Sequence, residues 1–243
     1  MALSLTAMCA LEVVIFDCMD ELSAFDFAPP QCVERERQLL AWADVVFTGG
    51  PSHYRAKQHR HPDMHLFPAS VDAGHFRQAL QGLPEPEDQA LLPHPRPGFF
   101  GVIDERMDLQ LLAYPAASHP EWHVMMIGSV VKIDPEIVPQ APNLHYLGPR
   151  SYAVLPAYLA GWDACLFPLA RNAATRFISP TKMLEYMAAE RPMVSTPITD
   201  VQEPYGDIVY LGDTLAAFVR PVNERWRPPK RSARGAVSPC APC

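Results

Sequence analysis

The feature that most constrains the fold is the alternation of short apolar runs with longer amphipathic stretches along the chain. Such alternation is typical of an α/β fold with a parallel sheet, because each strand must be joined to the next by a crossover helix. We therefore predict a doubly wound sheet, which binds its ligands beyond the carboxyl ends of the strands. The predicted strands are 11–17, 43–50, 64–72, 98–104, 122–130, 143–149, 163–169, 193–198 and 207–213; the predicted helices are 29–43, 108–120, 151–162, and two that begin at 179 and 214.

A segment rich in proline and acidic residues, 77–97, interrupts this alternation and is the predicted linker between two domains. Residues 1–76 supply about three strands, which is few for an open sheet, so we expect a partial domain there. Residues 98–220 supply about six strands and predict a second, larger domain. Residues 221–243 are basic, proline-rich and aperiodic, and they predict an irregular tail.

Composition excludes several classes of protein. The chain has 243 residues, of which 49% are hydrophobic and 19% are charged, as expected of a globular protein. Its formal charge of −7 argues against a nucleic-acid-binding protein, which needs a basic surface. No apolar run reaches the ~20 residues of a membrane span. The first residues lack a basic leading region and include Glu12, so we expect no signal peptide and a cytoplasmic location.

Cysteine and histidine patterns do not predict a metal site. The six cysteines show no metal-ligand spacing, and four of them lie among apolar residues, which predicts buried free thiols in a reducing cytosol. Residues 59–65 contain closely spaced histidines without an accompanying cysteine or carboxylate set, and we interpret them as a surface loop. The four cysteines are Cys9, Cys18, Cys32 and Cys165; Cys240 and Cys243, in the tail, have no assigned role.

The strongest candidate site is the stretch 176–192, which follows a predicted strand. Ser179 suits the N-cap and Pro180 the first helical position, which places Thr181 and Lys182 in the first turn. That turn carries unpaired N–H groups and the positive end of the helix dipole, which suit a phosphate. A lysine there is electrostatically unfavourable unless an anion binds.

Glu185 follows Lys182 by three residues, so the two share a helix face. A carboxylate one turn below a bound diphosphate can accept hydrogen bonds from a ribose diol, whereas the alternative is a solvated Lys182–Glu185 pair. Two strand-end loops are weaker candidates. Gly101 ends a strand before an acidic loop in which Arg106 can offer a bidentate fork to phosphate, unless that loop is merely solvated. Gly128 ends the next strand, where a turn is the default role.

The order of these motifs resembles the donor-binding core of retaining GT-B glycosyltransferases of the group 1/group 4 type. Residues 184–198, LEYMAAERPMVSTPI, take the place of the family's Glu-Ala-Met-Ala-x-Gly helix and Pro-Val-Val-x-Thr strand, and 69–72, ASVD, takes the place of Asn-Gly-Val-Asp. The likeness covers about residues 11–218. It implies a GT-B-like chain: a complete or near-complete Rossmann-like C-terminal domain, preceded by a partial Rossmann-like N-terminal domain, truncated at the N-terminus and altered at the C-terminus.

The resemblance also implies an activity. Such enzymes transfer a sugar from a UDP- or GDP-sugar with retention of configuration, usually without a metal or other cofactor. The acceptor would be a glycan or a lipid-linked glycan in bacterial surface polysaccharide or glycoconjugate synthesis, which allows peripheral association with the inner face of the membrane. Arg106 and Lys182 are the implied catalytic pair, Thr181 joins Lys182 on the diphosphate, and Glu185 binds the ribose. The other residues implied at the donor are Gly101, Gly128, Phe177, Ile178, Ser179 and Pro180.

One departure from the family pattern bears on the site. The family often places an acid eight residues before the helix glutamate, where this chain has Phe177, so we expect the Phe177–Ile178 backbone to contact the donor sugar. Two other functions stay open. One is a protein with the same fold that is associated with a sugar-nucleotide epimerase or mutase, and the other is a catalytically impaired fragment that only binds nucleotide.

Overall fold

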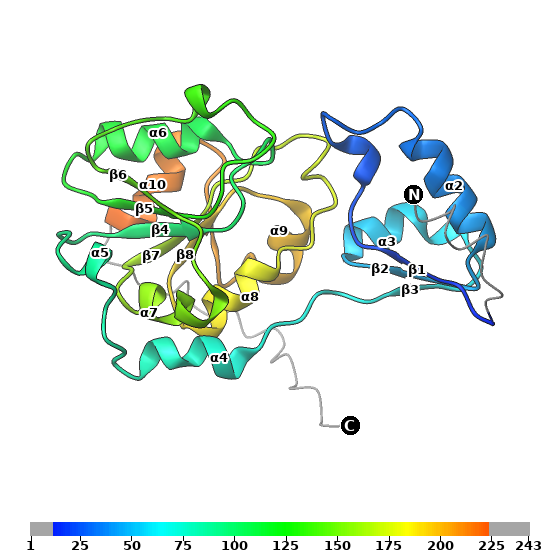
Figure 1. The fold of residues 1–243 in the computed structure, drawn as a ribbon, viewed down its shortest axis with the longest axis horizontal. Coiled ribbons are helices and arrows are strands. Elements are labelled where there is room, and N and C mark those ends of the chain that lie inside the picture. Colours follow the sequence, from blue (N-terminus) through cyan, green and yellow to red (C-terminus); the bar gives the residue numbers. More distant parts are fainter. Residues whose placement is uncertain (1–11, 224–243) are drawn as a thin grey trace.

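The computed structural model describes residues 12–223, which form two parallel β-sheets (Figure 1). The smaller sheet has the order β1-β2-β3, and the larger sheet has the order β6-β5-β4-β7-β8-β9. The larger order is the doubly wound one, with its first strand, β4, beside its fourth, β7. The strands are β1 (Ile15–Cys18), β2 (Val45–Thr48), β3 (Met64–Leu66), β4 (Pro97–Phe100), β5 (Val124–Ile127), β6 (Leu144–Gly148), β7 (Ala164–Phe167), β8 (Met193–Ser195) and β9 (Tyr210–Leu211).

Helices cover both faces of the larger sheet: α6 and α10 lie on one side, and α7 and α8 on the other (Figure 1). The predicted α/β class with parallel sheets is confirmed. The α-helices are α2 (Cys32–Trp42), α3 (Pro51–Lys57), α4 (Ala73–Arg77), α5 (Glu87–Ala90), α6 (Leu109–Ser118), α7 (Leu155–Ala160), α8 (Thr181–Ala188), α9 (Thr199–Tyr205) and α10 (Leu215–Asn223). The 3₁₀ turns are η1 (Leu22–Ala24), η2 (Gln58–Arg60), η3 (Gln78–Leu80), η4 (Pro135–Ile137) and η5 (Tyr152–Val154).

The strands are shorter than the apolar runs that predicted them. The run at 64–72 gives only β3, because Pro68 has no N–H with which to continue the ladder after Phe67 donates to the carbonyl oxygen of Thr48. The predictions for the first eleven residues, including Cys9, and those for the tail beyond Asn223, including Cys240 and Cys243, lie outside the described residues.

The passage between the two sheets is the extended stretch 67–72, which runs from β3 to α4 (Figure 1). The predicted linker, 77–97, instead packs on the larger sheet. Ala79 is buried there, and Trp162 Nε1 donates a hydrogen bond to Gln89 Oε1 over 2.8 Å. Phe76 is fully buried in the same core, so the structural boundary falls before α4 rather than after it. The prolines of 77–97 interrupt the apolar periodicity of the sequence, but apolar side chains of this segment, such as Ala79, still pack in the core.

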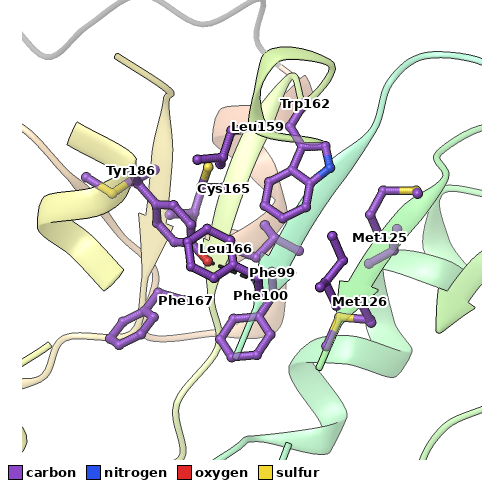
Figure 2. Packing of buried hydrophobic residues seen from close by; sticks show 14 of the residues in the cluster. Phe99, Phe100, Met125, Met126, Leu159, Trp162, Cys165, Leu166, Phe167 and Tyr186 are labelled. Atoms are coloured by element: carbon purple, nitrogen blue, oxygen red, sulfur yellow. Dashed lines mark hydrogen bonds between the residues drawn. The ribbon is translucent and has the colours of Figure 1, made fainter. Parts of the chain in front are cut away.

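The core of the larger sheet fixes the position of α8. Phe100 on β4 packs edge-on against Tyr186 of α8 with ring centroids 5.1 Å apart, and the Phe100 N–H donates to Tyr186 Oη over 3.2 Å (Figure 2). Met183, one turn earlier, is also fully buried. Burying each such side chain stabilises the fold by roughly 1.5–3 kcal/mol. These contacts place the first turn of α8 at the carboxyl ends of β4 and β7.

The cysteines and the histidine segment give mixed outcomes. Cys18 and Cys165 are buried free thiols, as predicted, whereas the free thiol of Cys32 is only half-buried. The interpretation of 59–65 as a surface loop is wrong for His61, which is buried and whose Nε2 lies 2.9 Å from the Ala43 carbonyl oxygen at the end of α2. Within residues 12–223, no helix has the length and apolar character needed to cross a bilayer.

Candidate functional site

A cavity of about 230 Å³ opens between β4 and β7, where the strand order of the larger sheet reverses. Doubly wound sheets bind their ligands at this point, because the loops diverge there and leave a crevice. We call it the switch-point cavity. Its lining comes from both sheets: Met19 and Asp20 from the smaller one, and Phe99, Val102, Asp104, Arg106, Met107, Phe167, Leu169, Ile178, Ser179, Pro180, Thr181 and Lys182 from the larger.

The start of α8 forms one end of the cavity and corrects the predicted cap. Pro180, with ψ of 94°, is itself the N-cap residue, and no side chain caps the helix. Ser179 therefore lies one position outside the helix, and Thr181 rather than Pro180 is its first residue. The Met183 N–H donates to the Pro180 carbonyl oxygen over 3.2 Å, whereas the N–H groups of Thr181 and Lys182 have no backbone partner among residues 12–223. The positive end of the helix dipole lies at the cavity.

Lys182 places a cation at this helix end. Its side chain is largely buried, and that burial lowers the pKa of its ammonium. Within the described part of the chain, it forms neither an ion pair nor a hydrogen bond, and the predicted alternative of a Lys182–Glu185 ion pair is not observed. A buried, unpaired ammonium in a cavity is costly unless an anion binds beside it.

Arg106 lines the same cavity and is held rigidly. Its Nε and Nη2 donate to the carboxylate of Asp104 over 3.0 and 2.7 Å, and these hydrogen bonds raise the pKa of the guanidinium. The guanidinium also lies over the ring of Phe25, 5.6 Å from its centroid. Nη1 has no hydrogen bond to any residue between 12 and 223, so a pre-oriented donor is left for a ligand.

Gly101 and Gly128 make room for these groups instead of lining the cavity. Both have positive φ, 144° and 145°, at the ends of β4 and β5. A Cβ on Gly101 would overlap the Lys182 side chain, and a Cβ on Gly128 would overlap the Gly101 carbonyl, with its carbon 2.7 Å away. The two glycines let the strand ends and the lysine pack in contact.

Glu185 and Phe177 lie apart from the cavity lining. Glu185 is half-buried; burial raises the pKa of its carboxyl group, and the nearby Lys182 ammonium acts in the opposite direction. Phe177 stacks on His53 of α3, with centroids 5.4 Å apart and the rings inclined by 20°. It therefore joins the two sheets, and only Ile178 of the predicted Phe177–Ile178 pair lines the cavity.

A second contact joins the sheets near Phe177. The N–H of Ser52, in the first turn of α3, donates to Asp200 Oδ1 over 3.0 Å, although Asp200 belongs to α9 of the larger domain. Gly50 leaves room for this carboxylate, since a Cβ there would overlap Asp200 Oδ2. Arg55 and Glu203 form an ion pair beside it at 2.7 Å. Asp200 thus acts as an N-cap supplied by the other domain.

Sequence reasoning missed Met19, Asp20 and Asp104 as cavity residues. Met19 and Asp20 are the first two residues after β1, so the rule that places ligands at strand carboxyl ends is the signal that could have found them. Asp104 belongs to the acidic loop that also contains Arg106, but its role as the buried partner of Arg106 is revealed only by the structure.

The doubly wound sheet, with a cation-lined cavity at its switch point, defines an α/β protein of the kind that binds its ligand at the carboxyl ends of parallel strands. Residues 95–223, more than half of the chain, match the family model described as glycosyl transferases group 1, and the chain belongs to this family.

A curated relative is the putative teichuronic acid biosynthesis glycosyltransferase TuaH of Bacillus subtilis (strain 168). It is 25% identical over 128 residues, which are 50% of this chain and 32% of the relative. The chain therefore spans about a third of that protein's length (32%).

Solved structures of low identity share the fold. Sucrose-phosphate synthase from Thermosynechococcus elongatus matches with a TM-score of 0.63 and 14% identity, over 92% of this chain and 62% of that one. Anabaena Alr3699/HepE, solved with UDP and glucose, matches with a TM-score of 0.63 and 11% identity, over 86% and 60%. The described residues have the GT-B fold of these neighbours.

Proposed function

We propose that this chain carries the donor site of a glycosyltransferase that moves a sugar from a nucleoside diphosphate sugar to a glycan or lipid-linked acceptor. The observation that carries the proposal is the unpaired, largely buried Lys182 beside Arg106 at the start of α8. The diphosphate that leaves in such a reaction gains negative charge. Pre-oriented cations and first-turn N–H groups stabilise that charge without reorganising, and so lower the barrier.

The chemistry assigned to each residue follows from its position. Lys182, Arg106 and the Thr181 backbone bind the diphosphate, and Ile178, Ser179 and Pro180 line the space for the donor sugar. Glu185, half-buried one turn below Lys182, accepts hydrogen bonds from the ribose hydroxyls. We also propose that the transfer retains configuration and needs no metal. The name of the Bacillus subtilis relative supports a place in polysaccharide synthesis, and the UDP and glucose of the Anabaena neighbour support a UDP-sugar donor.

The test is calorimetric titration of the chain with UDP, GDP and ADP. We expect one of the three to bind, and Lys182→Ala to weaken that binding about tenfold or more, as expected for a charge-assisted hydrogen bond. Lys132→Ala is the matched control, because the Lys132 ammonium lies over the ring of Phe25, 5.4 Å from its centroid, and does not line the cavity. No binding at millimolar concentration, or equal loss in both variants, would refute the donor site.

Donor turnover separates the remaining functions. Release of the sugar from the matching UDP-, GDP- or ADP-hexose, with the product anomer followed by NMR and EDTA present throughout, tests for a retaining, metal-independent transferase. A fragment that only binds nucleotide, or a protein that is only associated with an epimerase or mutase, would leave the donor intact.

A further inference from the structure

Among residues 12–223, Asp20 is the one charged residue that the smaller domain contributes to the lining of the switch-point cavity. It lies two residues beyond the end of β1, and its side chain is exposed. Its charge reaches Arg106 across the cavity: the hydrogen bonds and charge of Asp104 raise the pKa of the guanidinium most, burial lowers it, and Asp20 adds a smaller increase. In the part of the chain that the structure describes, Asp20 has no ion pair and no hydrogen bond.

A buried ionic network anchors the segment that presents Asp20. The next residue, Glu21, pairs with Lys57 Nζ at 2.8 Å, and Lys57 also pairs with Glu36 at 2.5 Å. The Lys57 side chain is only 4% exposed, so breaking either pair would leave a buried charge. On the other side of Asp20, the Met19 side chain packs against Gly49. A Cβ added to Gly49 would lie only 2.8 Å from Met19 Cε. These contacts hold the backbone of residues 19–21 in place.

The cavity thus has two electrostatic poles. The larger sheet supplies the positive pole, with Arg106, Lys182 and the first turn of α8, while Asp104 is already paired with Arg106. The smaller sheet supplies the negative pole, Asp20. Because a second carboxylate repels a diphosphate, phosphates bound at the positive pole would lie away from Asp20 and leave it to the part of the substrates beyond them. A carboxylate accepts hydrogen bonds but donates none, which suits a hydroxyl group and disfavours an anion.

We propose that Asp20 binds and orients a hydroxyl of the acceptor and thereby selects an uncharged sugar at the acceptor position. This assignment rests on the proposed function, because it needs a diphosphate at the positive pole. In this assignment, the Glu21–Lys57–Glu36 network fixes the backbone from which the acceptor-binding carboxylate of Asp20 projects. Asp20 is placed here as a binding residue for the acceptor, on the wall opposite the donor site.

The test measures binding of methyl β-D-glucoside, galactoside and mannoside, and of methyl β-D-glucuronide, by saturation-transfer NMR with the tightest-binding nucleoside diphosphate present at saturation. We expect at least one neutral glycoside to bind, and the glucuronide to bind more weakly. Asp20→Asn should weaken the neutral glycoside about tenfold, the effect of removing one charged hydrogen-bond partner. It should also reduce the difference in affinity between the neutral and anionic glycosides, because the Asp20 carboxylate would no longer repel the anionic one.

The control is Asp26→Asn, an exposed aspartate six residues further along the same connection that does not line the cavity. It should leave all glycoside affinities unchanged, and both variants should keep the thermal stability and nucleotide affinity of the parent chain. The proposal is overturned if no neutral glycoside binds, if Asp20→Asn leaves glycoside binding unchanged, or if Asp26→Asn weakens it equally. Failure of the nucleotide itself to bind refutes the proposed function instead, and is read from the titration without glycoside.

Discussion

Replacing Gly128 by alanine should destabilise the larger domain far more than the same change at Gly148, although both glycines end neighbouring strands with positive φ. At Gly128, φ is 145° and a new Cβ would overlap the Gly101 carbonyl, whose carbon would lie 2.7 Å away. That carbonyl cannot retreat easily, because the Gly101 N–H is bonded to the Ile127 carbonyl oxygen at 2.8 Å. At Gly148, φ is 69° and no atom lies within 4 Å of the Cβ position.

The expected losses of stability follow from the surroundings of Gly128 and Gly148. An alanine with the backbone of Gly128 carries about 1–3 kcal/mol of strain. Overpacking against a fixed carbonyl adds about 1–3 kcal/mol, for a total near 2–6 kcal/mol. Alanine at Gly148 incurs only the left-handed backbone cost of about 1–2 kcal/mol. Since 1 kcal/mol shifts Tm by about 2–4 °C for a chain of this size, Gly128→Ala should lower Tm by ~4–24 °C and Gly148→Ala by ~2–8 °C.

Differential scanning calorimetry of the parent chain and both variants measures the two shifts, and urea unfolding at 25 °C checks them. Gly128→Ala should also weaken nucleotide binding, because displacement of Gly101 disturbs the Lys182 side chain that packs over it. A Gly128→Ala shift no larger than that of Gly148→Ala would contradict the close contact between the Gly101 carbonyl and Gly128.

Three further predictions use buried ionisable groups. Burial lowers the pKa of Lys182 in the folded state, so its charge opposes folding below that pKa and ceases to do so as pH rises towards the unfolded value. Lys182→Met should therefore raise Tm at pH 7 while weakening nucleotide binding, and a lower Tm would contradict this reasoning. Burial raises the pKa of Asp200, so its charge opposes folding above that pKa and this effect fades as pH falls. Asp200→Asn keeps the capping oxygen and should leave Tm unchanged or raise it at pH 7, whereas Asp200→Ala should lower the free energy of unfolding by about 1 kcal/mol. Equal losses of stability in the two variants would show that Asp200 does not cap α3. Burial raises the pKa of Cys18 to about 11 and that of Cys165 well above its usual value, so iodoacetamide at pH 8 followed by peptide mass spectrometry should modify half-buried Cys32 before either.

The sheet could be predicted from sequence because strands buried on both faces must be apolar over their whole length. β5 and β7 are such strands, with every residue buried. By contrast, α9 was missed: its residues Thr199–Tyr205 show no apolar period, and Pro204 lies within it. Its position depends on contacts with α3, which no local pattern records.

The site residues also fall into those that a local sequence motif predicts and those that only the fold brings together. Ile178 to Lys182 are contiguous, so one strand-end motif was enough to bring them together as candidates. The cap was predicted one residue too early because Ser179 and Pro180 both match start signals, and only the ψ of Pro180 decides between them. Asp20 belongs to the same cavity but lies far away in sequence, so only the packing of the two sheets reveals it.

The hydrogen bond between Ser52 and Asp200 joins residues 148 positions apart, and this separation has a consequence for synthesis. Domains generally fold as they leave the ribosome, the N-terminal one first. Here α3 would be translated long before the carboxylate that completes its first turn, so its early N–H groups stay without that partner until α9 emerges. We expect the first turn of α3 to gain its final protection from hydrogen exchange only after α9 has formed, so that a helix of the larger domain completes the folding of the smaller one.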